Sequence, residues 1–226
     1  MKRYTKNKSK DKVLQTTQVR EAYEDMLIRI AITAEYKDPG AGGHIRRVSD
    51  YSTAIARSLG IPEDEIEILR YASMMHDIGK IGIPDVILEK ATSLTAEERK
   101  KMDEHTVIGG RIFGGSTSPI VMASSQIALT HHEKYDGMGY PKGLKGKDIP
   151  LYGRIVSVAD YFDALVSERR YKKAWSFDDA IADISKKAGS SFDINIVSAF
   201  MDVKETIKHI LEANNAITDF AENGKG

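Results

Sequence analysis

Apolar residues recur at three- and four-residue steps along most of this chain, the spacing that places them on one face of an α-helix. Strand-like alternation is short, and its best instance, RIVSVA at 154–159, falls inside a helical stretch. The pattern therefore predicts an all-α helical bundle without internal repeats. The predicted helices cover 18–36, 44–59, 62–80, 120–132, 153–166, 176–187 and 192–200, and further helices open at Thr95 and near Val203.

Local signals mark the helix ends. Pro62 is followed by three acidic residues, which suit the positive end of a helix dipole. Thr95 and Glu98 have the spacing of a capping box. The stretch HHEKYDGMGYP, 131–141, breaks the pattern because its glycines and proline force the chain out of regular structure. A glycine-rich loop thus follows directly after two adjacent histidines.

The 226 residues suffice for one domain with appendages. We predict a basic, disordered tail at 1–17, a connecting helix at 18–36, a catalytic domain at 31–201, and a C-terminal helix with a frayed end at 202–226. The tail is rich in lysine, so a tether to an anionic surface is the alternative interpretation.

Charge and composition exclude several classes. Lys plus Arg and Asp plus Glu both number 33, so no global field favours DNA or a membrane surface. No apolar run approaches the roughly 18 residues needed to span a bilayer. The basic start lacks the apolar segment of a signal peptide, so a cytoplasmic location is predicted. The absence of cysteine leaves histidine and carboxylate as the strong metal ligands.

Candidate chemistry lies at the helix ends. A buried carboxylate is costly unless it is paired or binds a metal, and two acids here follow apolar runs. The acids are Asp77 and Asp160, and five of the six histidines, His44, His76, His105, His131 and His132, fall at or near helix ends. The sixth, His209, is interpreted as a surface or packing residue. Seven ligands exceed the needs of one ion, so we predict two first-row metals with Asp77 as the bridge.

Lys80 follows His76 by one helical turn and is expected to face the same site. Two-metal sites typically stabilise both the attacking and the leaving oxygen of a phosphoryl displacement. An ammonium there would offset charge in a phosphorane-like transition state. The alternative is a solvated lysine after a helix-ending glycine.

These residues resemble a known family. His44, the dipeptide His76-Asp77 and Asp160 match the H…HD…D pattern of the HD phosphohydrolase superfamily. The longer motifs HDIGKIGIPD, EHTVIGGRIF and LTHHEKYDGMGYPKG, with SERRYKKA further on, look like the HD-GYP family of bacterial signalling hydrolases. The resemblance covers roughly 31–200. It implies an HD-type helical bundle with a glycine-rich GYP loop.

The resemblance also implies how the site residues divide. His44, His76, Asp77 and Asp160 are expected around one metal, and His105, His131, His132 and the bridging Asp77 around its neighbour. Iron or manganese is implied, with zinc or nickel as alternatives. Substrate contacts are implied for Lys80, Tyr140, Asp163, Arg169 and Lys172. Asp160 and Asp163 are spaced one helical turn apart, and a basic cluster follows them; both features agree with this expectation.

Three positions depart from the family pattern. Some relatives carry a glutamate four residues before the first histidine that helps to hold a third metal. Gly40 stands there in this chain, so a binuclear centre is predicted. The usual RPY is 169–171, Arg-Arg-Tyr, and the usual FDP is 192–194, Phe-Asp-Ile; neither change replaces a ligand.

The implied activity is hydrolysis of cyclic di-GMP to pGpG, with a second cut to GMP as an option. A metal-bridging hydroxide would attack phosphorus, with Asp77 and Lys80 as the catalytic residues. One alternative is a cyclic dinucleotide sensor without turnover, and another is an HD phosphohydrolase for a different nucleotide or a metal oxidase on the same helices. The resemblance further implies binding of diguanylate cyclase domains at the GYP loop and a homodimer through the N-terminal helix.

Overall fold

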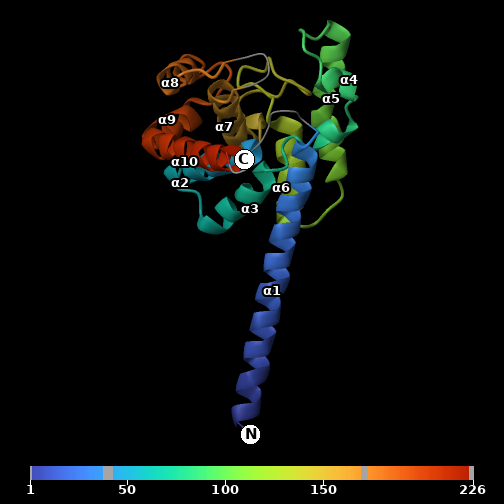
Figure 1. The fold of residues 1–226 in the computed structure, drawn as a ribbon, viewed down its shortest axis with the longest axis vertical. Coiled ribbons are helices and arrows are strands. Elements are labelled where there is room, and N and C mark those ends of the chain that lie inside the picture. Colours follow the sequence, from blue (N-terminus) through green and yellow to red (C-terminus); the bar gives the residue numbers. More distant parts are fainter. Residues whose placement is uncertain (1, 38–42, 169–172, 224–226) are drawn as a thin grey trace.

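The computed structural model describes residues 2–37, 43–168 and 173–223, with side chains between 18 and 214. Helices make up nearly all of its regular structure (Figure 1), and the β pairing within those ranges is an isolated bridge. The predicted all-α bundle is confirmed. The helices are α1 (Lys2–Glu35), α2 (His44–Ser58), α3 (Glu63–Ser73), η1 (Ile78–Gly82), α4 (Asp85–Leu88), α5 (Ala96–Ile112), α6 (Pro119–Thr130), η2 (Gly146–Asp148), α7 (Leu151–Val166), α8 (Phe177–Lys186), α9 (Ile194–Asp202) and α10 (Lys204–Asn223).

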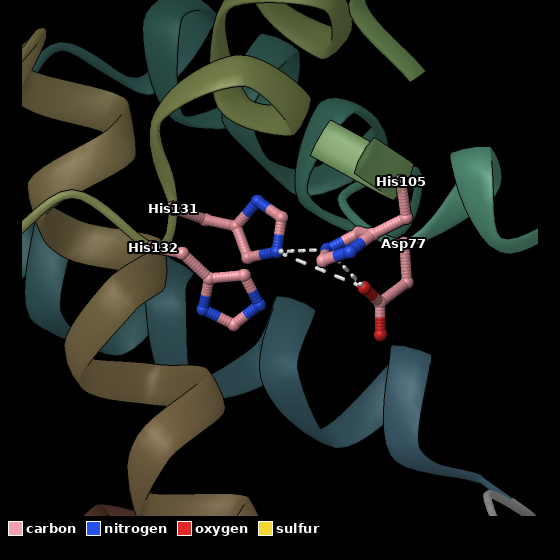
Figure 2. A group of neighbouring side chains, drawn as sticks. All are labelled: Asp77, His105, His131 and His132. Atoms are coloured by element: carbon pink, nitrogen blue, oxygen red, sulfur yellow. Dashed lines mark hydrogen bonds and ion pairs between the residues drawn. The ribbon is translucent and has the colours of Figure 1, made fainter. Parts of the chain in front are cut away.

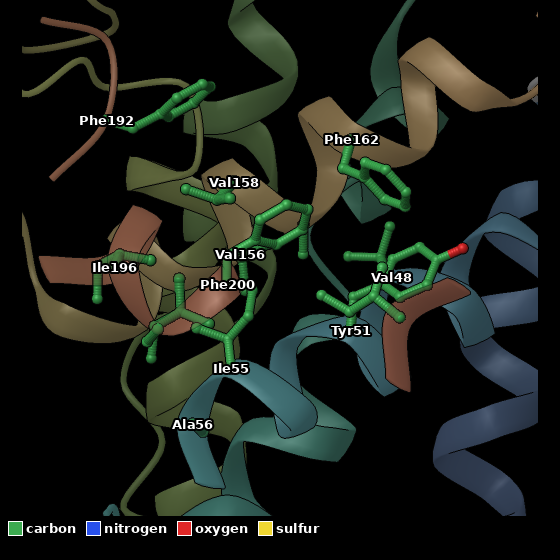
Figure 3. Close-up of a cluster of buried hydrophobic side chains, with 14 of the residues drawn as sticks. Val48, Tyr51, Ile55, Ala56, Val156, Val158, Phe162, Phe192, Ile196 and Phe200 are labelled. Carbon is green, nitrogen blue, oxygen red and sulfur yellow. The ribbon is translucent and has the colours of Figure 1, made fainter. Parts of the chain in front are cut away.

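The main core lies between α2, α7 and α9 (Figure 3). Tyr51 and Phe162 meet edge to face with ring centroids 5.2 Å apart, and Phe162 meets Phe200 in the same way at 5.3 Å. Such aromatic pairs add about 0.5–1.5 kcal/mol beyond the burial of their area. This core therefore fixes α7 against α2, the two helices that begin or carry candidate ligands.

Among the described side chains, those that pack α1 on the bundle lie in its C-terminal part. Its residues Leu27 and Ala31 belong to a second apolar cluster with Met74 and Met75 at the end of α3. The predicted connecting helix at 18–36 is this part of α1, which the structure continues back to Lys2 through the segment predicted as a disordered tail. Figure 1 shows the remainder of α1 projecting away from the bundle.

The predicted helix at 62–80 is shorter than expected. α3 ends at Ser73, and the chain turns before it enters the short 3-10 helix η1. Gly79 in η1 lies so close to α5 that a Cβ there would overlap the carbonyl oxygen of His105. Because glycine has no Cβ, the turn that holds His76 and Asp77 can rest directly on α5.

The capping box predicted at the start of α5 is confirmed. The Thr95 hydroxyl accepts a hydrogen bond from the Glu98 amide, and the Glu98 carboxylate accepts one from the Thr95 amide at 2.7 Å. These bonds satisfy amides that the first turn of a helix leaves without partners. They fix the start of the helix that delivers His105. Among the described residues, no helix combines the length and the apolar character needed to cross a membrane.

Candidate metal centre

All seven predicted ligands meet at the centre of the bundle, in two adjoining groups. Within each group the possible ligand atoms lie within 4.8 Å of one another. The first group, in Figure 2, comes from the turn before η1, from α5 and from the end of α6. The second comes from the start of α2, the end of α3 and α7. The groups are Asp77, His105, His131 and His132, and His44, His76 and Asp160.

Asp77 lies between the two groups. Its Oδ1 is 3.3 Å from Nε2 of His105 in the first group, and its Oδ2 is 3.5 Å from Nε2 of His76 in the second. A carboxylate with one oxygen toward each group has the geometry of a bridging ligand. The grouping agrees with the division that the motifs implied, while metal binding by these residues stays a prediction.

Four histidines are held with Nε2 toward the centre. In each, Nδ1 faces a protein oxygen, which accepts a hydrogen bond when Nδ1 carries the proton. The partners are Asp163 Oδ2 for His44 at 2.7 Å, the Ser73 carbonyl for His76 at 2.8 Å, the Met102 carbonyl for His105 at 2.7 Å and the Ile127 carbonyl for His131 at 3.0 Å. Metal-binding histidines are oriented in this way, since the Nδ1 bond fixes the tautomer and leaves Nε2 with a lone pair.

The possible ligand atoms face one another at distances that suit a cation between them. Nε2 of His44 lies 3.2 Å from Nε2 of His76, and Nε2 of His105 lies 3.4 Å from Nε2 of His131. Asp77 Oδ1 is buried without a hydrogen-bond partner. Lone pairs that point at one another inside a protein are unfavourable unless a shared cation binds them. Five imidazoles and two carboxylates suit divalent first-row metals, so this donor set fits such ions.

Burial and nearby charges hold Asp77 and two of the histidines in the protonation states in which such residues bind metals. Burial opposes ionisation of Asp77, but Lys80 and His76 hold its pKa well below the usual range. Burial lowers the pKa of His105 to about 4, and burial and His131 lower that of His132. Asp77 is therefore anionic, and both histidines are neutral, the states in which these groups bind metals.

His76 is the exception. Its burial opposes the charged form, yet Asp77 and Asp160 raise its pKa to about 9. The two carboxylates thus favour positive charge at this part of the centre.

Asp163 lies behind His44 instead of on the cavity wall. Its side chain is fully buried, and it accepts hydrogen bonds from His44 and from Arg47, whose Nε lies 2.6 Å from Oδ1. Burial opposes its ionisation, but these partners lower its pKa to about 2. The predicted substrate contact of Asp163 does not match this position. The structure gives the residue a different task, the orientation of the His44 ring.

The glycine-rich loop is anchored by a residue that the sequence analysis missed. Glu133 is buried, and its carboxylate accepts hydrogen bonds from the amides of Lys142 at 2.8 Å and Leu144 at 3.0 Å. Gly139 passes so close to residue 134 that a Cβ would overlap its amide nitrogen. The sequence did carry a signal for this anchor, since Glu133 is an acid that stands between the histidine pair and the glycines. The loop is thereby tied to the end of the helix that supplies His131.

Tyr140 of this loop reaches the centre. Its ring centroid lies 4.9 Å from that of His132 and 6.4 Å from that of His105. Burial, together with the nearby charge of Asp103, raises the pKa of its hydroxyl, which therefore stays protonated. The tyrosine can thus pack over two ligands and donate a hydrogen bond.

A cavity of about 690 Å³ opens over the ligands. Its floor includes Asp77 and Lys80, whose Nζ lies 2.6 Å from Asp77 Oδ2, and Tyr140 lines it as well. Two of the predicted substrate contacts thus lie on its surface. Arg169 and Lys172, and the departures at Gly40 and 170–171, fall outside the described residues. The volume is in the range typical of small-molecule sites.

The fold and the site together define the class of this protein: it is an all-α protein in which histidines and aspartates meet beside an open cavity. A family model described as "HD domain" matches residues 29–196, and this chain belongs to that family. The resemblance to HD-GYP phosphodiesterases is also confirmed by the named relatives.

Among these relatives is the cyclic di-GMP phosphodiesterase response regulator RpfG of Xanthomonas campestris pv. campestris, 42% identical over 193 residues, which cover 85% of this chain and 51% of that protein. The 3'3'-cGAMP-specific phosphodiesterase 2 of Vibrio cholerae is 36% identical over 184 residues, 81% of this chain and 35% of that protein. The chain thus spans about half or less of the length of these curated relatives.

A solved structure supports the fold alone. The HDG"Y"P protein Bd1817 from Bdellovibrio bacteriovorus superposes with a TM-score of 0.57 at 22% identity, over 72% of this chain and 51% of that one. The helical arrangement is therefore one that occurs in solved proteins of this kind.

Proposed function

We propose that this chain is a metal-dependent phosphodiesterase that hydrolyses cyclic di-GMP to pGpG, with further cleavage to GMP as an option. One observation carries the proposal: Asp77 lies between two groups of ligands at the floor of an open cavity. Paired metal sites of this kind are suited to displacement at phosphorus. The names of the relatives agree with this chemistry and point to a bacterial signalling nucleotide.

We further propose that the centre holds two ions, with iron or manganese ahead of zinc or nickel. His44, His76 and Asp160 would hold one ion. His105, His131 and His132 would hold the other, with Asp77 between the two ions. Bound divalent ions supply Lewis acidity at the phosphoryl oxygens. Elemental analysis of the purified protein tests the number directly. Three ions per chain would overturn the binuclear proposal.

The chain's own residues act around the reacting phosphate. Lys80 is anchored by Asp77, so its ammonium is placed to offset negative charge that grows on the phosphoryl oxygens. Tyr140 covers His132 and His105, and in this position it shields one side of the centre from water. Nδ1 of His105 and of His131 faces a backbone carbonyl, which keeps Nε2 of both rings toward the centre.

The direct test is product analysis. The protein is purified without oxygen, loaded with Fe(II) or Mn(II), and incubated with cyclic di-GMP, and the products are separated by chromatography. We expect pGpG or GMP, and loss of both products in Asp77→Ala. The variant His209→Ala, changed in α10 away from the centre, serves as the matched control. Full activity in Asp77→Ala would contradict the proposal.

A second candidate differs in substrate only. One relative is named for 3'3'-cGAMP, so the same centre in this chain could favour a mixed cyclic dinucleotide. A panel of cyclic di-GMP, 3'3'-cGAMP and cyclic di-AMP under the same conditions separates these cases. If metal-loaded protein binds a cyclic dinucleotide but releases no product, the chain is a sensor.

Partners belong to the same proposal. At the glycine-rich loop Met138 is 78% exposed, and an apolar tip of this kind suits a protein partner such as a diguanylate cyclase domain. A cytoplasmic location, where such partners and cyclic di-GMP occur together, completes this part of the proposal.

We also propose a homodimer through α1. Val19, Tyr23, Met26 and Ile30 are between 40% and 65% exposed, although all four are apolar. They recur at alternating four- and three-residue steps, the spacing of a coiled-coil seam. The neighbouring face of α1 is already occupied by the bundle. A seam of this spacing is self-complementary, so a second copy of the chain is the partner that fits.

A further inference from the structure

We infer that Arg99 binds the second phosphate of a cyclic dinucleotide, the one that is not being cut. The inference rests on the proposed function, because such a substrate carries two phosphodiester groups. Only one of them can lie over the ligands at a time. The other enters the same cavity with its own negative charge, and an anion removed from water requires a compensating donor.

Among the described residues, five cationic side chains line the cavity, and three of them already have anionic partners. Lys80 is paired with Asp77, Lys90 with Glu98, and Lys187 lies 3.7 Å from Asp183. The remaining two are Arg99 and Lys134. The structure gives neither of them an ion pair with a described carboxylate, although the charge of Arg99 acts on Asp103, one turn further along α5. Both can therefore take up an additional anion without breaking an ion pair.

The position of Arg99 suits the task. Arg99, Met102 and His105 follow one another at three-residue steps on α5, and all three line the cavity. Arg99 is thus six residues along α5 from a candidate ligand. That separation is about 9 Å along a helix axis, which places Arg99 beside the centre but beyond the reach of the ligands.

Nearby groups support an anion at this end of the cavity. Thr92 and Ser93, in the segment between α4 and α5, line the same cavity and offer hydroxyl donors. Arg99 and Tyr140 line the same cavity as the ligands His105 and His132, so a nucleotide that extends from the ligands along the α5 wall would meet Arg99.

Arginine is better suited than lysine to this role. Its planar guanidinium can bind two phosphate oxygens at once, whereas an ammonium acts as a point charge. Arg99 and Lys134 are both exposed, and Lys134 follows the histidine pair on the loop side of the cavity. We therefore assign the second phosphate to Arg99, together with the hydroxyl groups of Thr92 and Ser93.

The test compares Arg99→Gln with Arg111→Gln, a variant of the same helix whose side chain is exposed and does not line the cavity. Two substrates are used: cyclic di-GMP, and bis(p-nitrophenyl) phosphate, which has a single phosphodiester. We expect Arg99→Gln to raise KM for cyclic di-GMP about tenfold or more, as for loss of one charged hydrogen bond, and to leave kcat within about twofold. Hydrolysis of the small substrate should be unchanged, and Arg99→Lys should recover part of the loss.

Two results would overturn the assignment. One is an unchanged KM for cyclic di-GMP in Arg99→Gln, and the other is an equal loss with both substrates, which would indicate general damage to the centre. Equilibrium dialysis of cyclic di-GMP with metal-depleted protein measures the affinity of each variant for the nucleotide without turnover. If wild-type protein hydrolyses no cyclic dinucleotide, the proposed function fails. Weaker binding by Arg99→Gln than by Arg111→Gln would then still support the contact, and equal binding would overturn it.

Discussion

Asp163 accepts a hydrogen bond from Nδ1 of His44 at 2.7 Å and, through its other oxygen, one from Arg47 at 2.6 Å. All three side chains are buried. One carboxylate thereby fixes the tautomer of a candidate ligand and balances the charge of a buried guanidinium. Ligand orientation and the stability of the bundle depend on the same residue.

Asp163→Asn is expected to weaken metal binding about 10- to 100-fold, the usual effect of removing a group that orients a metal-binding histidine. It should also destabilise the fold by about 3–5 kcal/mol, because Arg47 would keep a buried charge without its partner. Competition with a chromophoric chelator and urea unfolding measure the two effects. Asp25→Asn, at an exposed ion pair of α1, is the control and should change neither quantity.

Gly79→Ala should separate the turn that holds Asp77 from α5. The new Cβ would overlap the His105 carbonyl oxygen, and backbone cannot move aside as a flexible side chain can. We expect a loss of about 1–3 kcal/mol in unfolding free energy and less bound metal per chain. Gly114→Ala is the matched control, since the nearest atom to its Cβ would be 3.4 Å away. Equal metal content in the two variants would show that the close approach is not needed.

Glu133→Ala should release the glycine-rich loop while leaving the ligands in place. The amides of Lys142 and Leu144 would lose their acceptor, at a cost of about 1–3 kcal/mol for each group that stays buried. Turnover should fall because Tyr140 is no longer held over His132, whereas metal content should persist. Glu104→Ala, at a half-exposed ion pair on α5, provides the comparison. A variant that lost its metal but kept the loop in place would contradict this account.

Removal of metal should lower the thermal unfolding midpoint. A bound cation would contact ligands from several segments at once, such as His44 at the start of α2 and His76 after α3, whose Nε2 atoms lie 3.2 Å apart. An ion at about 100 times its dissociation constant contributes about 2.7 kcal/mol. Melting with a chelator and then with added Mn(II) measures the difference. In Asp77→Asn the gain on adding metal should be largely lost, and a full gain there would argue against Asp77 as a ligand.

The double variant Met26→Glu, Ile30→Glu should convert a dimer into a monomer. Both residues belong to the exposed apolar seam of α1, and charges introduced at such a seam repel across it. Light scattering after size-exclusion chromatography gives the mass. Glu21→Lys, also exposed on α1 but off the seam, should remain dimeric. A monomeric wild-type protein would refute the dimer.

Much of the centre could be predicted from the sequence because its ligands sit in recognisable motifs. His76-Asp77 follows an apolar run, and His131-His132 precedes a stretch that cannot be helical. Periodicity likewise indicated the helices, and local composition indicated the capping box at Thr95. These signals are local, so a single sequence is enough to read them.

The remaining features depend on contacts between distant segments. Asp163 has the same spacing from Asp160 whether it faces substrate or His44, and only the packing of α2 on α7 decides between them. The early end of α3 goes together with the close packing of Gly79 on α5, a contact between segments that local sequence does not reveal. A role for Arg99 could not be predicted from the sequence, since an arginine on a charged helix is a candidate contact only once the cavity beside it is known.

The wide separation of the ligands along the chain has a consequence for how the protein matures. His44 opens the second helix and Asp160 lies in α7, so more than about a hundred residues must be synthesised between two donors of one group. No local segment can assemble that group early, and long loops are closed only when the surrounding packing offsets their entropy. The group of ligands that includes His44 and Asp160 is therefore complete only after α2 and α7 have packed together.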